Sequence, residues 1–382
     1  MTSTGPFYSE DHEAFRDVLR AFVDSEITPN VDAWERDGQL PRLLHRKAAQ
    51  IGMFGVGFPE AYGGLGTDDA LLRVLIGQEV ARCGAGGVNA SLLTSYIALP
   101  PILQGGSDRL KERVLPPVLA GDKIAALAVT EPSGGSDVAA ITTRAVRDGD
   151  QYIVNGSKVF ITSGMRADHF TVAVRTGDGP GAAGISILVI DADNPGLSRT
   201  AMDKMGWHRS DTATLHFDDC AVPADNLLGK ENRGFATIVD NFNLERLDVI
   251  ALATTSARLC LEEAIAYRRE RHTFGMRRVD HQTIRHKIAE MARHVLATQS
   301  LLDLLAWRVN NGDEVIAEIA LAKIQATTTF EYCARETMQI FGGAGYMQGS
   351  GVERLYRDAR VLPIGGGAEE IMRDLAIRQM RI

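Results

Sequence analysis

The stretch Ala128-Val-Thr-Glu-Pro-Ser-Gly-Gly-Ser-Asp137 marks the point where the sequence passes from a strand-like run into a polar, glycine-rich loop. Before it, from about residue 8 to 120, apolar residues such as Phe15, Leu19 and Phe22 recur every three or four positions. This spacing predicts helices, because it places the apolar side chains on one helical face. The stretch therefore closes a helical region and opens a region of another kind.

After the stretch the period changes to that of strands. Short runs rich in apolar and β-branched residues occur at 125–130, 152–154, 171–174, 185–190 and 212–217. Turn dipeptides such as Asp148-Gly149 and Asn155-Gly156 separate them. From Phe235 onward the helical spacing returns over stretches too long to be strands. We therefore predict an α+β fold with an N-terminal all-α domain over 1–123, a middle β domain over 124–230 and a C-terminal helical domain over 231–382.

Length and composition agree with a globular protein of several cores. The chain has 382 residues, 45% of them hydrophobic and 24% charged, and a single core stops growing at roughly 250–300 residues. The 41 basic and 49 acidic residues give a net charge of −8 with no basic block. We therefore expect no nucleic-acid partner, because binding to phosphate backbones requires a basic surface.

Cysteine and histidine spacing bears on metal sites and on the compartment. Cys83, Cys220, Cys260 and Cys333 lie far apart, and the nine histidines show no H-x-x-x-H pair. Neither a metal site nor a disulfide framework is predicted, and a reducing compartment is favoured. The N-terminus lacks the pattern of a signal peptide and no run is apolar enough to span a bilayer. We therefore expect a cytoplasmic protein without an integral membrane segment.

The loop that follows Ala128 has a chemistry of its own. Its exposed N–H groups and hydroxyls are suited to a pyrophosphate or to the edge of a flavin ring. The same composition also fits an ordinary turn. The loop does not match the G-x-G-x-x-G fingerprint of a dinucleotide-binding βαβ unit. A nicotinamide site of that kind is therefore disfavoured.

The segment Thr130-Glu-Pro-Ser-Gly-Gly-Ser-Asp137 resembles the flavin-binding signature of the acyl-CoA dehydrogenases. Further motifs of that family follow in the family's order: Asn155-Gly-Ser-Lys-Val-Phe-Ile-Thr-Ser-Gly164, Arg269-Glu-Arg-His-Thr-Phe-Gly275, Asp280-His-Gln282, Gln339-Ile-Phe-Gly-Gly-Ala-Gly345, Arg357-Asp-Ala-Arg360 and Ile364-Gly-Gly-Gly-Ala-Glu-Glu-Ile371. Each motif alone is a weak match, but together and in order they identify the chain as resembling this family.

The resemblance implies a middle domain of two packed sheets, a C-terminal four-helix domain and a homotetramer. It also implies an acyl-CoA substrate, FAD between the middle and C-terminal domains, and an electron-transferring flavoprotein as electron acceptor. The FAD contacts that it implies are Leu127, Val129, Thr130, Gly135, Ser136, Phe160, Ile161, Thr162, Arg271, Thr273, Phe274, His281, Gln282, Gln339, Ile340, Phe341, Gly342, Gly343, Ala368 and Glu370. Phe160 stands where many relatives have Trp, and the Thr162 hydroxyl is expected to reach flavin N5. Arg271, Gln282 and 339–343 are expected to reach the FAD of a neighbouring subunit.

The resemblance places the catalytic base on a helix. Removing an α-proton from a thioester requires a carboxylate of raised pKa and hydrogen-bond donors on the thioester carbonyl. Many family members carry this Glu in the C-terminal loop, at the position where this chain has Gly366. Members resembling isovaleryl-CoA and long-chain acyl-CoA dehydrogenases carry it in the segment that here reads Asn243-Leu-Glu-Arg-Leu247. Glu245 is therefore the candidate base, and the N–H of Gly366 is the candidate donor.

Helical spacing around Glu245 agrees with this role. The residues three and four positions away are Asn241, Phe242, Asp248 and Val249, and none is a cation. An apolar face and a nearby like charge would raise the pKa of the glutamate. The alternative is an ordinary solvent-exposed glutamate on a helix.

The remaining predictions concern the substrate. The expected substrate contacts are Ser136, Phe242, Arg246, Gly365 and Gly366. Arg246 points about 100° away from Glu245 on a helix and is expected to organise the site. The glycine loop leaves space for a branched or long acyl chain, although the chain length stays open. Two alternatives remain: an acyl-CoA oxidase or other thioester elimination on the same scaffold, and a non-catalytic FAD-binding assembly protein.

Overall fold

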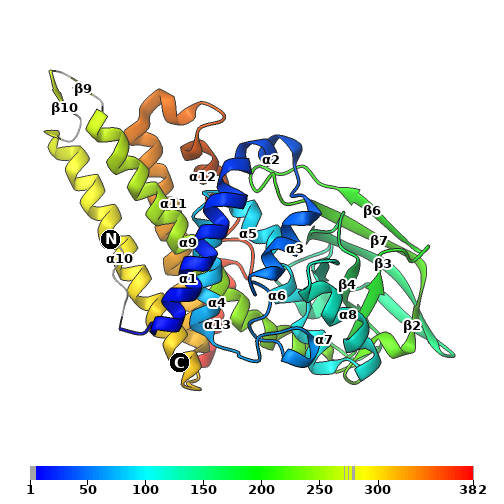
Figure 1. The fold of residues 1–382 in the computed structure, drawn as a ribbon. Helices are drawn as coiled ribbons and strands as arrows, with labels where there is room; N and C mark the ends of the chain where they lie inside the picture. Colours follow the sequence, from blue (N-terminus) through cyan, green and yellow to red (C-terminus); the bar gives the residue numbers. More distant parts are fainter. Residues whose placement is uncertain (1–5, 271, 274, 278–279, 382) are drawn as a thin grey trace.

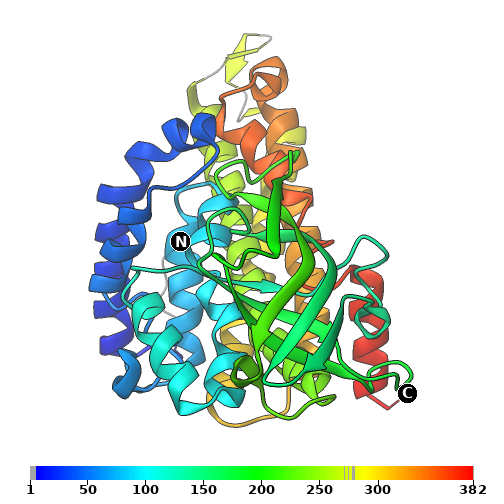
Figure 2. The same ribbon diagram turned by 90° about the vertical axis from the view of Figure 1, so that its right-hand side faces the viewer.

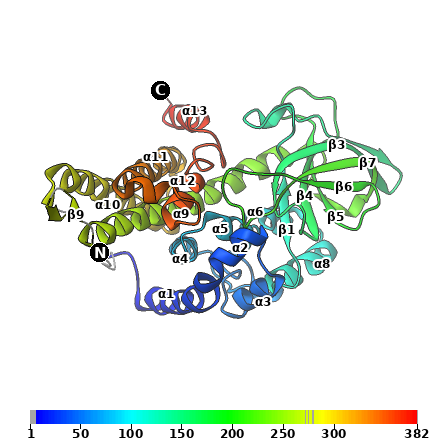
Figure 3. The same cartoon turned by 90° about the horizontal axis from the view of Figure 1, so that it is seen from above.

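The computed structural model describes residues 6–270, 272–273, 275–277 and 280–381. Helices of the N-terminal and C-terminal regions lie side by side, and a strongly curved sheet adjoins them (Figure 1). The predicted order of helical, β and helical regions is confirmed. Viewed from above, the long C-terminal helices lie on one side and the sheet on the other (Figure 3).

The N-terminal region consists of short helices. They are α1 (Glu10–Phe22), α2 (Val31–Asp37), α3 (Arg42–Gln50), α4 (Ala70–Ala81), α5 (Gly86–Leu92), α6 (Ser95–Ala98), α7 (Pro100–Gly105) and α8 (Asp108–Leu119). Helix α4 is apolar on nearly all sides because it lies between two cores. Leu75 and Val80 belong to the core of the N-terminal region, whereas Leu71 and Val74 belong to the core of the C-terminal helices. The three regions therefore do not fold around separate interiors.

The middle region contains eight strands. They are β1 (Ala125–Ala128), β2 (Arg144–Asp148), β3 (Gln151–Thr162), β4 (His169–Arg175), β5 (Ile185–Asp191), β6 (Leu197–Ala201), β7 (Thr212–Pro223) and β8 (Leu227–Leu228). Hydrogen bonds connect them in the order β6-β7-β3-β2-β4-β5-β8, with β1 parallel to β4. Figure 2 shows the molecule from the side of this sheet.

The two halves of this sheet are joined at one place. Strand β2 pairs with β4 only through Arg144 and Arg175. Side chains of both halves, among them Tyr152, Phe170 and Leu215, form one core. The predicted middle β domain is confirmed, and its two packed halves belong to a single continuous sheet, because the start of β2 reaches the end of β4.

The C-terminal region contains the long helices α9 (Gly234–Glu270), α10 (Gln282–Asn310) and α11 (Ile316–Phe341), followed by α12 (Gly351–Ala359) and α13 (Glu369–Gln379). The short strands β9 (His272–Thr273) and β10 (Met276–Arg277) connect α9 to α10. Helix α11 packs against α9, α10, α12 and α13. Helix α9 begins against β5, where a Cβ on Gly234 would lie 2.8 Å from the carbonyl carbon of Ser186. This contact brings the first turns of α9 to the sheet.

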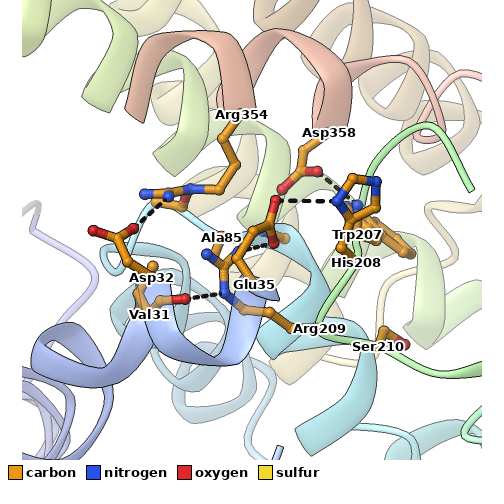
Figure 4. A network of polar contacts seen from close by, with 12 residues as sticks. Val31, Asp32, Glu35, Ala85, Trp207, His208, Arg209, Ser210, Arg354 and Asp358 are labelled. Atoms are coloured by element: carbon orange, nitrogen blue, oxygen red, sulfur yellow. Dashed lines mark hydrogen bonds and ion pairs between the residues drawn. The ribbon is translucent and has the colours of Figure 1, made fainter. Parts of the chain in front are cut away.

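A buried polar network ties α2, the loop between β6 and β7, and α12 together (Figure 4). Arg209 is fully buried; its Nε donates to Val31 O at 2.7 Å, and its Nη1 lies 2.7 Å from Glu35 Oε2. Asp358 accepts from the N–H groups of Trp207 at 2.7 Å and Gly86 at 3.0 Å. Charged groups from the three regions of the chain thus meet in the interior, although Nη1 and Nη2 of Arg209 and Oε2 of Glu35 have no hydrogen-bond partner among the described residues.

Two kinds of feature are absent from the part of the chain that the structure describes. No helix within it is long and apolar enough to cross a membrane. No group of three or more His, Cys, Asp or Glu side chains within it is arranged to hold a metal ion.

Candidate active site

Glu245 lies in the first third of α9, with its side chain half-buried. Its Oε2 is buried and has no hydrogen-bond partner among the described residues. Burial, followed by the like charge of Asp248, raises its pKa to about 7, although the cations Arg246, Arg73 and Lys323 act in the opposite direction. A carboxylate of this pKa is divided between its two protonation states near neutral pH, as a general base requires.

The neighbouring carboxylate, Asp248, is already engaged. Arg73 of α4 donates to it from Nε at 2.8 Å and 3.1 Å and from Nη2 at 2.6 Å. Burial raises the pKa of Asp248, and Arg73 opposes that change. Asp248 therefore acts as a fixed, paired charge beside Glu245, whose Oε2 stays available for a proton. Sequence spacing identified Asp248 but not its partner, because Arg73 lies far away along the chain.

The glycine loop before α13 comes directly to this carboxylate. A Cβ built on Gly366 would lie 4.0 Å from Glu245 Oε1 and 3.6 Å from Val249 Cγ2. The φ of Gly366 is +66°, a conformation that favours glycine. The carboxylate on α9 thus lies beside the position that the resemblance associates with a loop glutamate. Glu245 and Gly366 are therefore close neighbours in the fold although they are distant in sequence.

Lys323 of α11 holds this loop from the other side. Its side chain is fully buried, and its Nζ donates to Gly365 O at 2.8 Å and to Gly367 O at 2.5 Å. Burial, and then the nearby Arg246, lowers its pKa to about 8. Sequence reasoning missed this residue. A lysine among the buried alanines of α11 was the available signal, because lysine is rarely buried without a partner.

Arg246 and Phe242 line the same part of α9. Arg246 is 6% exposed, its Nη1 donates to Asn243 Oδ1 at 2.7 Å, and its buried Nε has no hydrogen-bond partner among the described residues. Phe242 is half-buried against the N-terminal core. Asn241 donates to Ile97 O at 2.7 Å and so ties α9 to α6. Phe242 and Arg246 thus lie on the same stretch of α9 as Glu245, and Gly365 and Gly366 belong to the loop that approaches it. Their contact with a substrate stays a prediction.

The loop that carries Thr130 is anchored by a buried ion pair. Glu131 accepts from Lys158 Nζ at 2.8 Å and from the N–H groups of Thr142 at 2.6 Å and Thr143 at 2.8 Å. Burial disfavours the ionised form of Glu131, but Lys158 and these hydrogen bonds outweigh it and lower its pKa. The N–H of Val159 donates to Thr130 O at 2.9 Å. The start of the loop is thus fixed against β3.

Phe160 lies next to this anchored loop and is unusual in two respects. Its side chain is 65% exposed and its φ is +63°, within a register shift of the β3–β7 ladder. An exposed aromatic residue in a strained conformation is typical of a binding site. Gly135 and Ser136 are exposed, and Thr162 is half-buried. A planar ring with a phosphate tail, as in FAD, fits this combination of exposed ring, hydroxyls and loop N–H groups.

Other predicted FAD contacts in this region support the loop from behind. Ile161 and Val129 are buried, and Leu127 is half-buried on β1. Ala368 precedes the first residue of α13, and Glu370 is exposed in its first turn. Because the side chains of Ile161 and Val129 are buried, these two residues could contact FAD only through their backbone or support the site through packing.

A second set of predicted FAD contacts lies far from Glu245. Gln339, Gly342 and Gly343 are exposed at the end of α11. Phe341 stacks on Tyr267 with ring centroids 4.0 Å apart. Tyr267 stands about six turns beyond Glu245 on α9, roughly 33 Å at 1.5 Å per residue. Within one chain these residues are therefore not brought to the carboxylate.

The remaining members of that set are found near the same end of the bundle (Figure 1). Thr273 belongs to β9, His281 immediately precedes α10, and Gln282 begins it. Ile340 is buried. Arg271 and Phe274 lie outside the described residues. A surface groove of about 400 Å³ lined by Met205, Tyr332 and Tyr356, among others, contains none of the predicted site residues.

Comparison with known families covers nearly the whole chain. Residues 9–122, 126–220 and 232–381 match the N-terminal, middle and C-terminal domains described for acyl-CoA dehydrogenase, respectively.

Individual relatives agree with this match. The mitochondrial long-chain specific acyl-CoA dehydrogenase of Sus scrofa is 35% identical over 98% of this chain and 87% of its own. The 3-(aryl)acrylate reductase of Clostridium sporogenes is 34% identical over 96% and 97%. The crystal structure of a probable acyl CoA dehydrogenase from Mycobacterium abscessus is similar at a TM-score of 0.95, with 47% identity over 98% and 100%.

Two further solved structures that are similar to this chain are named for activities other than acyl-CoA dehydrogenation. One, titled as the electron transferring flavoprotein of Acidaminococcus fermentans, is similar at a TM-score of 0.93, with 33% identity over 99% of both chains. The other is a prolyl acyl carrier protein oxidase, with a TM-score of 0.90 and 27% identity over 98% of this chain and 100% of that one.

Proposed function

Because the chain belongs to the acyl-CoA dehydrogenase family, we propose that it converts a saturated acyl-CoA to the trans-2-enoyl-CoA, with Glu245 as the base. The family consists of FAD-dependent oxidoreductases acting on the CH–CH group, and this chain is such an enzyme with FAD as its cofactor. The observation that carries the assignment of the base is the buried, unpartnered Oε2 of Glu245 beside the Gly366 loop.

The residues of the chain have distinct parts in this proposal. Glu245 accepts the α-proton of the thioester, and the N–H of Gly366 donates to the thioester oxygen, on which negative charge develops. Phe242 lines the acyl side, while Arg246, with its free Nε, donates to a polar group of the substrate. Ser136 and Gly365 complete the contacts. When bound, FAD supplies the acceptor for the β-hydride.

On the flavin side, Phe160 stacks against the ring, and Thr130, Gly135, Ser136 and Thr162 offer hydroxyls and N–H groups. The support is the exposure of Phe160 together with its place beside the anchored loop. The electrons then pass to an electron-transferring flavoprotein. The similarity to the solved structure of the electron transferring flavoprotein of Acidaminococcus fermentans supports this acceptor. The four buried, unpaired cysteines agree with a reducing compartment such as the cytoplasm.

The test of the base is an anaerobic titration with straight, branched and long acyl-CoAs, following the visible absorption of the oxidised flavin. The wild type should bleach with one class, which also identifies the acyl chain. The Glu245→Gln variant should retain FAD and bind the same ligand, yet bleach about 10²–10⁴-fold more slowly, because a positioned base contributes a factor of about this size. A variant as fast as the wild type would remove Glu245 from the mechanism and favour a different base.

A second candidate function is an oxidase acting on a carrier-protein thioester, which the similarity to the prolyl acyl carrier protein oxidase favours. Oxygen consumption during turnover separates the two, since an oxidase reoxidises its flavin with oxygen directly. A protein that bound FAD but bleached with no thioester would instead match the assembly-protein alternative.

We also propose a homotetramer in which Gln282 and 339–343 reach the FAD of a neighbouring subunit. The support is the roughly 33 Å along α9 between this region and Glu245. Gln339→Ala should therefore weaken FAD binding although Gln339 is remote from the carboxylate, and dilution below the assembly range should release FAD. Sedimentation with flavin detection measures both. FAD retained by a monomer would contradict the shared site.

A further inference from the structure

Lys323 is a fully buried cation whose Nζ donates to the backbone carbonyls of Gly365 and Gly367. Burying an ammonium group is costly unless its donors are satisfied. The carbonyls of Gly365 and Gly367 satisfy two of its three donors. The carboxylates Glu245 and Glu369 favour its charged form, whereas Arg246 disfavours it. Lys323 therefore joins α11 to the loop beside the proposed base.

The contact with Gly365 O has a geometric consequence. A trans peptide unit is planar, and its C=O and N–H point in opposite directions. The C=O of Gly365 and the N–H of Gly366 belong to the same unit, and no described peptide bond is cis. Holding the carbonyl on Lys323 therefore turns the Gly366 N–H away from α11. The contact with Gly367 O directs the N–H of Ala368 in the same way.

The loop needs such an anchor because its own residues restrict it little. Gly366 and Gly367 have φ values of +66° and +99°. Glycine populates many backbone conformations, so three consecutive glycines leave the peptide planes free to rotate unless something binds them. An oxyanion donor, by contrast, is effective only when its direction is fixed before the reaction.

We propose that Lys323 is a positioning residue that holds the Gly365–Gly367 loop so that the Gly366 N–H faces the thioester oxygen beside Glu245. This inference rests on the proposed function and deepens it. Lys323 touches neither substrate nor cofactor in this proposal; it acts through the backbone of the loop.

The charge of Lys323 gives a second effect with a defined direction. Lys323 is one of the cations that lower the pKa of Glu245, together with Arg246 of the same helix and Arg73 of α4, while Asp248 raises it. On the Lys323 side, Glu369 of α13 is the other nearby carboxylate. Removing the Lys323 charge should therefore raise the pKa of Glu245 and move the acid limb of the rate profile to higher pH.

The test is Lys323→Met, which keeps most of the length of the side chain and removes its charge and donors. The matched control is Lys287→Met on α10, which removes a lysine that pairs with Glu336 in another part of the bundle. Both variants are prepared as FAD-loaded protein. The main readout is the pKa of a bound 3-oxoacyl-CoA, such as acetoacetyl-CoA or a longer homologue, followed by ultraviolet difference spectroscopy. Its enolate places negative charge on the oxygen that faces the loop, without turnover.

In Lys323→Met the pKa of the bound ligand should rise by about 2, which corresponds to about 10²-fold weaker stabilisation of the enolate. The kcat should fall by a similar factor while the affinity for a saturated acyl-CoA changes little, and the acid limb should move upward. Lys287→Met should behave as the wild type in all three measurements. If Lys323→Met does not retain FAD, Lys323→Gln, which keeps an uncharged N–H donor group on a shorter side chain, should show the same changes to a smaller extent.

An unchanged ligand pKa in an FAD-loaded Lys323 variant would overturn the proposal and leave Lys323 with a purely structural role. Failure of the proposed function gives a different result, because the wild type itself would then neither bind the 3-oxoacyl-CoA nor lower its pKa.

Discussion

At the scale of single residues, Glu245 combines a buried oxygen without a partner and a raised pKa. Such a group reduces stability when it is ionised, because the charge has left water without a compensating hydrogen bond. The folded state therefore binds the proton more tightly than the unfolded chain does. Its contribution to stability is present at low pH and is lost as the pH rises through about 7.

Glu245→Gln should therefore be more stable than the wild type at pH 8, by up to about 3 kcal/mol, and the difference should disappear toward pH 4. Thermal unfolding of the FAD-free proteins across this range measures it. Glu112→Gln, on the exposed side of α8, makes the same change of charge and should show no such dependence. A stability difference for Glu245→Gln that did not vary with pH would contradict the raised pKa.

At the scale of elements, strand β3 carries a strained residue where its ladder with β7 shifts register. Phe160 adopts a φ of +63° with its ring exposed to solvent. A left-handed conformation costs a non-glycine residue roughly 1–2 kcal/mol. Because most of the ring is exposed, packing within the chain offsets little of this conformational cost. We expect stacking against a flat ligand to offset it.

Phe160→Gly should relieve the strain and raise the stability of the FAD-free protein by about 1 kcal/mol or less, because glycine also loses more entropy on folding. It should weaken FAD binding by about tenfold, since aromatic stacking contributes about 0.5–1.5 kcal/mol beyond buried area. Phe160→Tyr retains both ring and strain and should resemble the wild type. Thermal unfolding and flavin fluorescence titration give the two quantities. Unchanged FAD affinity in Phe160→Gly would exclude the stacking role.

At the scale of the whole molecule, the buried network around Arg209 joins the three regions that the sequence arranges one after another (Figure 4). Removing one member of a buried ion pair leaves its partner charged and unpaired, which costs about 3–5 kcal/mol. Replacing both members by apolar residues avoids that penalty. The network is therefore expected to control how firmly α2 and α12 are held to the β region.

Arg209→Met should lower the free energy of unfolding by about 1–3 kcal/mol, less than for a partner left wholly unpaired, because Val31 O loses its donor but Glu35 keeps Arg357 as a partner at 2.9 Å. Adding Glu35→Leu should change this loss little further. Arg357 keeps Glu353 as a partner at 2.6 Å in the double variant. Arg46→Met, which breaks the exposed pair with Asp122, should cost less than about 1 kcal/mol. Denaturant unfolding measures all of them. Equal losses for Arg209→Met and Arg46→Met would show that the network adds no stability.

Much of the architecture and part of the site could be predicted from sequence alone. Local periodicity distinguished helices from strands, because the spacing of apolar residues reflects which face each short segment buries. The motif Asn243–Leu247 led to Glu245, and its neighbours at helical spacing showed that no cation follows it on the same face. The motif of 130–137 located the loop beside Phe160. The prediction of two packed sheets did not include the single pair between Arg144 and Arg175 that joins them, because no local pattern encodes it.

The tertiary structure decided what surrounds these residues. Arg73 reaches Asp248 from another helix, and Lys323 reaches the glycine loop from α11. The approach of Gly366 to Glu245 likewise depends on how α9 and the loop pack. Sequence spacing reports neighbours within one helix or strand, because backbone geometry fixes their distances. Contacts between distant segments depend on the packing of whole elements, and it is this packing that sets the burial, charge and pKa of the proposed base.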